Sequence, residues 1–132
     1  MSSPDDSLAR NKATILETGT HGRVVVLTAT SKVMDEIEEQ PRDRLTRIMQ
    51  LWCIGKPLTE KMFNGNEGRS KGRKRLLMAF KAWKVRLYGC VGTLGGIKTF
   101  VIVSVDPAKK QEKADKNALK NAKIRIDDID WD

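Results

Sequence analysis

Histidine and cysteine are scarce in this 132-residue sequence, and their scarcity excludes several kinds of site. Because His21 is the single histidine, the chain can hold neither a catalytic pair of imidazoles nor a His-rich metal site. Two cysteines, Cys53 and Cys90, make neither a disulfide framework nor a zinc site. Reduced thiols of this kind are typical of cytoplasmic proteins, and we expect that location here.

Long apolar runs and cofactor motifs are also missing. The longest apolar runs span about five residues, as at 76–80, whereas a membrane helix needs ~20. The opening MSSPDDSLAR does not resemble a secretory signal, so we expect no membrane partner. The G-x-x-x-x-G-K-[ST], G-x-G-x-x-G, H-E-x-x-H and G-x-S-x-G motifs do not occur. We therefore expect no cofactor and no metal.

Acidic residues are absent from one long stretch of a basic chain. Lys and Arg number 25 against 17 Asp and Glu, which gives a net charge of +8 and favours a polyanionic partner. Between Gly68 and Val105 there is no carboxylate, which argues against a two-metal nuclease centre. The alternative interpretation is a basic surface that only keeps the protein in solution. The basic residues of this stretch are Arg69, Lys71, Arg73, Lys74, Arg75, Lys81, Lys84, Arg86 and Lys98.

The length fits one domain, because domains of 100–150 residues are the commonest size. Residues 1–22 are polar, and we expect a flexible N-terminal arm there. Residues 127–132 read as an acidic, frayed tail, which leaves 23–126 as the folded domain.

Hydrophobic patterning predicts an α+β fold. A small mixed, largely antiparallel sheet is expected, with two N-terminal helices and one C-terminal helix. Pro41 fits the first turn of the second helix, and an apolar stripe at i, i+3, i+4 and i+7 runs from Leu45 to Trp52. The predicted strands are 23–29, 75–81, 83–90 and 97–105, and the last helix is predicted over 109–126.

The segment 83–88 combines an apolar face with a charged one. Strand alternation places its apolar residues in the core and Lys84, Arg86 and Tyr88 together on the other face. An Arg fork can hold two phosphate oxygens, and a Lys can neutralise charge that develops in a transition state. Tyr88 could stack on a base or exchange a proton. The alternative is an ordinary solvated strand face.

Lysines recur along the predicted last helix. Lys109, Lys113, Lys116, Lys120 and Lys123 follow helical spacing and form one stripe. Such a stripe could extend a groove for a nucleic-acid backbone, or it could be a solvated face.

The segments AWKVRLYG, KTFVIVSV and DPAKKQEKADKNALKNAKIR, taken in this order, resemble the RelE superfamily of bacterial toxins. The HigB-like and phage-derived toxins are the most similar subgroup, and the resemblance covers residues 23–126. It implies cleavage of mRNA, often on the translating ribosome, without a metal. The 2′-hydroxyl would attack the adjacent phosphate while cations stabilise the developing charge. It also implies an acidic cognate antitoxin that covers the basic groove.

The resemblance assigns the family's strand arginine to Lys84 or Arg86, and we expect Lys84, Arg86 and Tyr88 to be catalytic. Many members carry a Tyr or His near the C-terminus, whereas this chain has Trp131 in an acidic tail. Two alternatives stay open: a non-catalytic relative that binds RNA or an acidic protein, and a toxin that inhibits gyrase. The expected RNA-binding residues are Arg73, Lys74, Arg75, Lys98, Lys109, Lys110 and Lys113.

Overall fold

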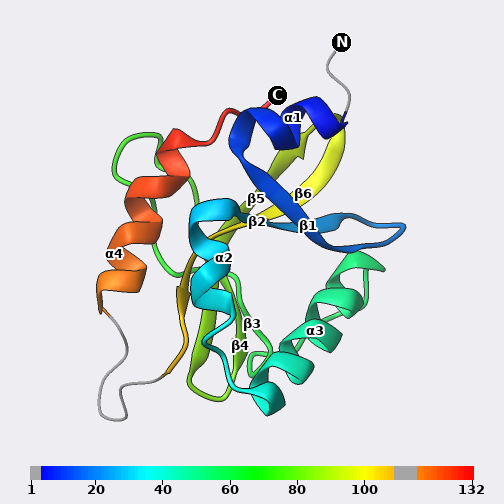
Figure 1. The fold of residues 1–132 in the computed structure, drawn as a ribbon, viewed down its shortest axis with the longest axis vertical. Helices are drawn as coiled ribbons and strands as arrows, with labels where there is room; N and C mark the ends of the chain where they lie inside the picture. Colours follow the sequence, from blue (N-terminus) through cyan, green and yellow to red (C-terminus); the bar gives the residue numbers. More distant parts are fainter. Residues whose placement is uncertain (1–3, 109–115) are drawn as a thin grey trace.

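The computed structural model describes residues 4–108 and 116–132. It is an α+β fold built on one six-stranded sheet in the order β1-β2-β6-β5-β4-β3. Figure 1 shows the arrangement of the helices around this sheet. The predicted fold class is confirmed, although the helix arrangement differs from the expected one. The helices are α1 (Pro4–Asn11), α2 (Thr28–Met34), α3 (Glu39–Cys53) and α4 (Lys116–Arg125), followed by a 3₁₀ turn, η1 (Ile126–Asp128). The strands are β1 (Ala13–Thr18), β2 (Arg23–Leu27), β3 (Phe63–Asn64), β4 (Met78–Ala82), β5 (Val85–Leu94) and β6 (Ile97–Asp106).

The centre of the sheet is the long hairpin of β5 and β6. Its turn uses Gly95 and Gly96, both at positive φ, a conformation that glycine adopts without steric cost. β2 lies parallel to β6, and the other pairings are antiparallel, so the sheet is mixed and largely antiparallel as expected.

Both faces of the sheet are covered, and each face has its own apolar core. On β6, Phe100 and Ile102 belong to the core under α2 and α3, whereas Val101 and Val103 belong to the core under α1 and α4. The predicted stripe of α3 packs into the first of these cores. A strand buried on both faces has a nearly continuous apolar sequence, and FVIVSV is apolar except for the buried Ser104.

The expectation of a flexible arm over residues 1–22 is wrong for residues 4–18, which form α1 and β1. β1 pairs with β2 at the edge of the sheet, and Leu8 of α1 is buried. Ile15 of β1, by contrast, is 43% exposed. β1 is therefore held by its backbone pairing with β2 together with the partly buried Ala13 and Leu16, a pattern too weak for the sequence to reveal.

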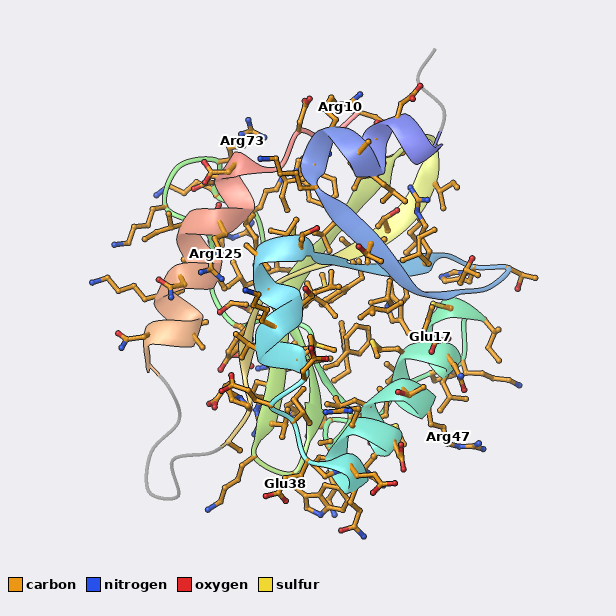
Figure 2. All side chains as sticks on the ribbon, viewed as in Figure 1. Arg10, Glu17, Glu38, Arg47, Arg73 and Arg125 are labelled. Atoms are coloured by element: carbon orange, nitrogen blue, oxygen red, sulfur yellow. The ribbon has the colours of Figure 1, made fainter. Side chains whose placement is uncertain are left out.

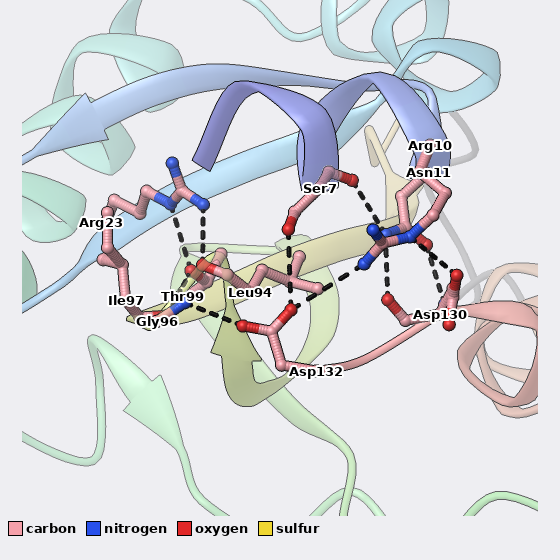
Figure 3. Close-up of polar contacts among 10 residues, drawn as sticks. All are labelled: Ser7, Arg10, Asn11, Arg23, Leu94, Gly96, Ile97, Thr99, Asp130 and Asp132. Atoms are coloured by element: carbon pink, nitrogen blue, oxygen red, sulfur yellow. Dashed lines mark hydrogen bonds and ion pairs between the residues drawn. The ribbon is translucent and has the colours of Figure 1, made fainter. Parts of the chain in front are cut away.

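The C-terminal segment is likewise packed, so the expectation of a frayed tail is wrong (Figure 3). The Asp132 carboxylate accepts a hydrogen bond from the backbone N–H of Gly96 at 2.7 Å. Asp130 pairs with Arg10 of α1, with 2.7 Å between oxygen and Nε. Asn11 of α1 adds hydrogen bonds in both directions with the backbone of Asp130. The aspartates thus join the C-terminus to α1 and to the β5–β6 turn.

In the described part of the chain the last helix, α4, begins at Lys116, and the predicted start at 109 lies outside the described residues. The predictions for Lys109, Lys110 and Lys113 lie outside the described residues. Within residues 4–108 and 116–132, no helix combines the length and the apolar character that crossing a bilayer requires.

Candidate nucleic-acid interface at the Trp83 hairpin

The turn between β4 and β5 presents an exposed tryptophan. Trp83 and Lys84 form this turn, and the Trp83 residue is 61% exposed. The sequence placed Trp83 on the core face of a strand, and that expectation is wrong because the strand pairing ends at Ala82 and resumes at Val85. Trp83 also has a φ of +51°, which is costly for a residue with a Cβ.

A cavity of about 630 Å³ opens beside Trp83. Lys81 and Arg86 reach it from β4 and β5, where they lie directly opposite one another in the ladder. One carboxylate, Glu60, shares the cavity with four cationic side chains, so positive charge predominates. The lining residues are Arg44, Glu60, Lys61, Lys81, Trp83 and Arg86.

The Arg86 side chain is held at the hairpin by hydrogen bonds to nearby backbone carbonyl groups. Its Nη1 donates hydrogen bonds to the carbonyl oxygens of Trp83 and Val85. Both bonds come from one nitrogen of the fork, which leaves the donors on Nε and Nη2 outside these two interactions. The Arg86 guanidinium therefore borders an open cavity with donors to offer, as a phosphate ligand requires.

Arg44 connects α3 to the hairpin. Its guanidinium carbon lies 5.5 Å from the centroid of the Trp83 ring, in a cation–π contact. The contact places a second arginine at the cavity and supports the indole from the side of α3. Trp83 is thus an aromatic surface with cations around it, the combination that single-stranded nucleic acids favour.

A second, smaller cavity of about 330 Å³ borders the same tryptophan. It lies between the hairpin, the start of α3 and the end of β6. Its lining includes Glu38, Gln40, Pro41, Trp83, Lys84 and Pro107. Trp83 therefore lies between a cationic cavity and one that combines apolar rings with three polar or charged residues, Glu38, Gln40 and Lys84.

The predicted trio of Lys84, Arg86 and Tyr88 is not brought together on one solvated face. Lys84 lies in the turn and Arg86 at the first cavity, but Tyr88 is only 4% exposed. The predicted strand alternation placed Tyr88 on the correct face of the sheet, the one away from α3. That face, however, is covered by α1 and α4. Tyr88 packs in the core under α1 and α4, so the expected exposed position is wrong.

The other predicted RNA-binding residues lie elsewhere. Arg73 donates to the carbonyl of Ile129 at 2.8 Å, and Arg75 lies 4.5 Å from the Trp131 ring centroid. Lys74 is exposed in the same loop, residues 69–75, which we call the basic loop. Figure 2 shows Arg73 at the upper end of α4, at the opposite end of the molecule from Glu38. The basic loop thus packs against the C-terminal segment rather than lining the Trp83 cavities.

Lys98 occupies a third location. Its Nζ is 2.9 Å from Nε2 of His21 and 5.3 Å from the Trp52 ring centroid. In the β5–β6 ladder, Lys98 pairs with Thr93 near the turn, whereas Arg86 pairs with Asp106 at the other end. The acid-free stretch therefore does not form a single continuous patch.

Three residues of the first cavity were missed by the sequence reasoning: Arg44, Glu60 and Lys61. They come from α3 and from the loop before β3, far from the hairpin along the chain. Lys81 was counted in the basic stretch without a site role. The expectation that carboxylates are absent from the site is wrong, because the fold brings Glu60 to the cavity. These segments come together only in the folded structure, so the spacing of residues in the sequence could not indicate that they share a cavity.

Among residues 4–108 and 116–132, no group of three or more His, Cys, Asp and Glu side chains is arranged to hold a metal ion. In comparisons with known proteins, the chain matches no family model, no curated protein and no solved structure.

Proposed function

We propose that this protein is an endoribonuclease that cleaves single-stranded mRNA in the cytoplasm, as the toxin of a toxin–antitoxin system. The observation that supports it best is the first cavity, where four cations and one carboxylate surround an exposed tryptophan. Nucleic acids carry the two features that such a site would bind, a phosphate charge and a stackable base.

RNA would bind across the hairpin tip. A base stacks on Trp83, and the neighbouring phosphate enters the cationic cavity, where Arg86 and Lys81 lie opposite each other. Base–aromatic stacking contributes about 1–3 kcal/mol per base and tolerates any sequence. The Arg86 fork binds two phosphate oxygens, and the lysines neutralise the added charge of the transition state.

The cleavage step needs only side chains of this cavity. Glu60 accepts the proton of the ribose 2′-hydroxyl, whose oxygen then attacks phosphorus. A bond forms between phosphorus and the 2′-oxygen, and the bond to the 5′-oxygen breaks. The departing 5′-oxygen takes a proton from Lys81. The products are a 2′,3′-cyclic phosphate and a free 5′-hydroxyl.

The same chemistry accommodates a regulatory partner. An acidic segment of an antitoxin would compete with RNA for Arg44, Lys61, Lys81 and Arg86, because carboxylates and phosphates pair with the same cations. The mRNA would be presented on the translating ribosome, which holds a single strand in an extended form.

The test compares wild type with Arg86→Ala on mRNA, free and on translating ribosomes. We expect the variant to cleave about 10²–10³ times more slowly, because one preorganised transition-state donor is lost. Arg47→Ala is the matched control, since Arg47 is an exposed arginine of the same α3 helix that carries Arg44 and does not line the cavity.

Cleavage products of wild type should end in cyclic phosphates. If wild type binds RNA with a steep salt dependence but never cuts it, even on ribosomes, the protein is a non-catalytic binder and the nuclease proposal fails. Equal cleavage by wild type and Arg86→Ala would also contradict it.

A further inference from the structure

Apart from Trp83, on which a base is proposed to stack, the residues of the second cavity have no role in the binding and cleavage steps described above. This cavity shares Trp83 with the cationic cavity, and its volume of about 330 Å³ lies at the lower end of the range for small-ligand sites. The nucleotide attached to the cleaved phosphate also has a base, and that base needs a binding site next to the phosphate site. The smaller cavity is adjacent to the proposed phosphate site and of a size suited to one planar ring system.

Its walls suit the faces of a base. Trp83, Pro41 and Pro107 supply flat, apolar surfaces, and Val85 lies at the base of the hairpin. The polar lining is limited to Lys84 in the hairpin turn and to two residues at the start of α3, Glu38 and Gln40. This pattern, apolar walls with a few directed polar groups, is how proteins bind an aromatic ligand and fix its orientation.

Glu38 is the first of those polar groups. It is the residue that precedes the first turn of α3, yet its side chain makes no capping hydrogen bond to the helix. An N-terminal flanking position usually carries a side chain that caps the helix N–H groups. The Glu38 carboxylate is exposed at the cavity instead, with two acceptor oxygens side by side.

Gln40 is the second polar group, and it lies two residues further along. Its amide offers both a donor and an acceptor. Guanine presents two adjacent donors, N1–H and the N2 amino group, next to the acceptor O6. A carboxylate beside an amide donor complements that edge. Adenine and cytosine place a ring acceptor where the second carboxylate oxygen would lie, and uracil offers one donor between two acceptors.

We infer that the second cavity is a guanine subsite, in which Glu38 accepts from N1–H and N2–H of the base and Gln40 donates to O6. This inference rests on the proposed function, because it gives that ribonuclease a base preference next to the cleaved phosphate. The bound base lies against Trp83, and the attached phosphate reaches Arg86 in the neighbouring cavity.

The test uses oligoribonucleotides that differ at one position. One set carries guanine, adenine, cytosine or uracil in a constant flank, and a further one carries inosine, which lacks only the N2 amino group. We expect wild type to cleave at guanine at least about tenfold faster than at uracil, since a bidentate base contact gives discrimination of this order. Inosine should lose most of that advantage.

Glu38→Gln should reduce the guanine preference to about threefold or less, because the amide turns one acceptor into a donor facing N–H. Glu39→Gln is the matched control: it makes the same charge change at the next residue, which does not line the cavity, and it should keep the preference. Equal cleavage of inosine and guanine, or an unchanged preference in Glu38→Gln, would overturn the subsite.

A second measurement separates this inference from the proposed function. Oligonucleotides with a 2′-deoxy sugar at the cleaved position cannot react, so their binding is measured without chemistry. Tighter binding of the guanine form by wild type, lost in Glu38→Gln, supports the subsite even if cleavage is never seen. Equal binding of all four bases would overturn the subsite while leaving cleavage by the cationic cavity intact.

Discussion

Trp83 combines three properties that are individually uncommon for a large aromatic residue. It is exposed, it has a left-handed backbone conformation, and it borders both cavities. A glycine would fit the positive φ without strain, and a polar residue would suit the solvent. A residue that opposes both folding preferences is most simply explained by a function of its side chain.

Trp83→Gly separates the functional from the structural contribution of this residue. Relief of backbone strain offsets the lost Arg44 contact, so we expect the free energy of unfolding to change by less than about 1 kcal/mol. RNA affinity should fall about tenfold or more, since a stacking surface is removed. Denaturant titration and RNA binding measure the two effects.

Trp83→Phe is the control for this change. It keeps an aromatic ring at the same strained position, so it should retain most of the RNA affinity of wild type. A large loss of stability in Trp83→Gly, comparable to emptying a core position at about 3–5 kcal/mol, would show that the residue is structural.

At the scale of elements, the C-terminal segment stabilises the basic loop that precedes β4. The Asp127 carboxylate accepts three hydrogen bonds, from the Ser70 hydroxyl and from the backbone N–H groups of Gly72 and Arg73, at 2.7–2.9 Å. These hydrogen bonds lower the pKa of Asp127 below its ordinary value of 3.8, and the bond from Ser70 has the largest effect. The loop therefore depends on the ionised form of one side chain.

Asp127→Asn should lower the denaturant midpoint at neutral pH, because the amide cannot accept all three hydrogen bonds. The pKa of Asp127 is lowered on folding, so its stabilisation is present above pH 3.8 and is lost as pH falls through the lower folded value. The difference between wild type and variant should therefore shrink as the pH falls below 3.8 and through the lower pKa of the folded state. Asp128→Asn, one residue along, is the matched control.

Hydrogen exchange locates the effect of this substitution. The amides of Gly72 and Arg73 should exchange faster in Asp127→Asn than in wild type, whereas those of β5 should be unchanged at neutral pH. Equal protection of the loop in both proteins would contradict the proposed contribution of Asp127.

Elements with strong side-chain patterns could be predicted from the sequence, and elements held by backbone pairing could not. The α3 stripe and the apolar strand at 97–105 carry enough buried side chains to show their period. β1 has the exposed Ile15 and only an edge pairing, so its pattern is weak. Arg86 was found because strand alternation over 83–88 places it on the charged face with Lys84, whereas Glu60 and Arg44 reach the site only through the tertiary fold.

At the scale of the whole molecule, the two cores on opposite faces of the sheet each contain one free cysteine. Cys53 lies in the core under α2 and α3, and Cys90 in the core under α1 and α4. Burial raises the pKa of Cys53 to about 11 and that of Cys90 to about 12. Since the thiolate is the reactive form, each thiol reports on the opening of its own core.

Single-thiol variants test whether the two cores unfold together. Cys53→Ala leaves only Cys90, and Cys90→Ala leaves only Cys53, so each reports one face of the sheet to a thiol reagent. Because β5 and β6 contribute to both cores, neither face can open without disrupting the central hairpin. We expect both thiols to react slowly in the native state, with rates that follow the population of unfolded molecules and rise together with denaturant. Fast labelling of Cys53 alone would show instead that α3 detaches from a sheet that stays folded under α4.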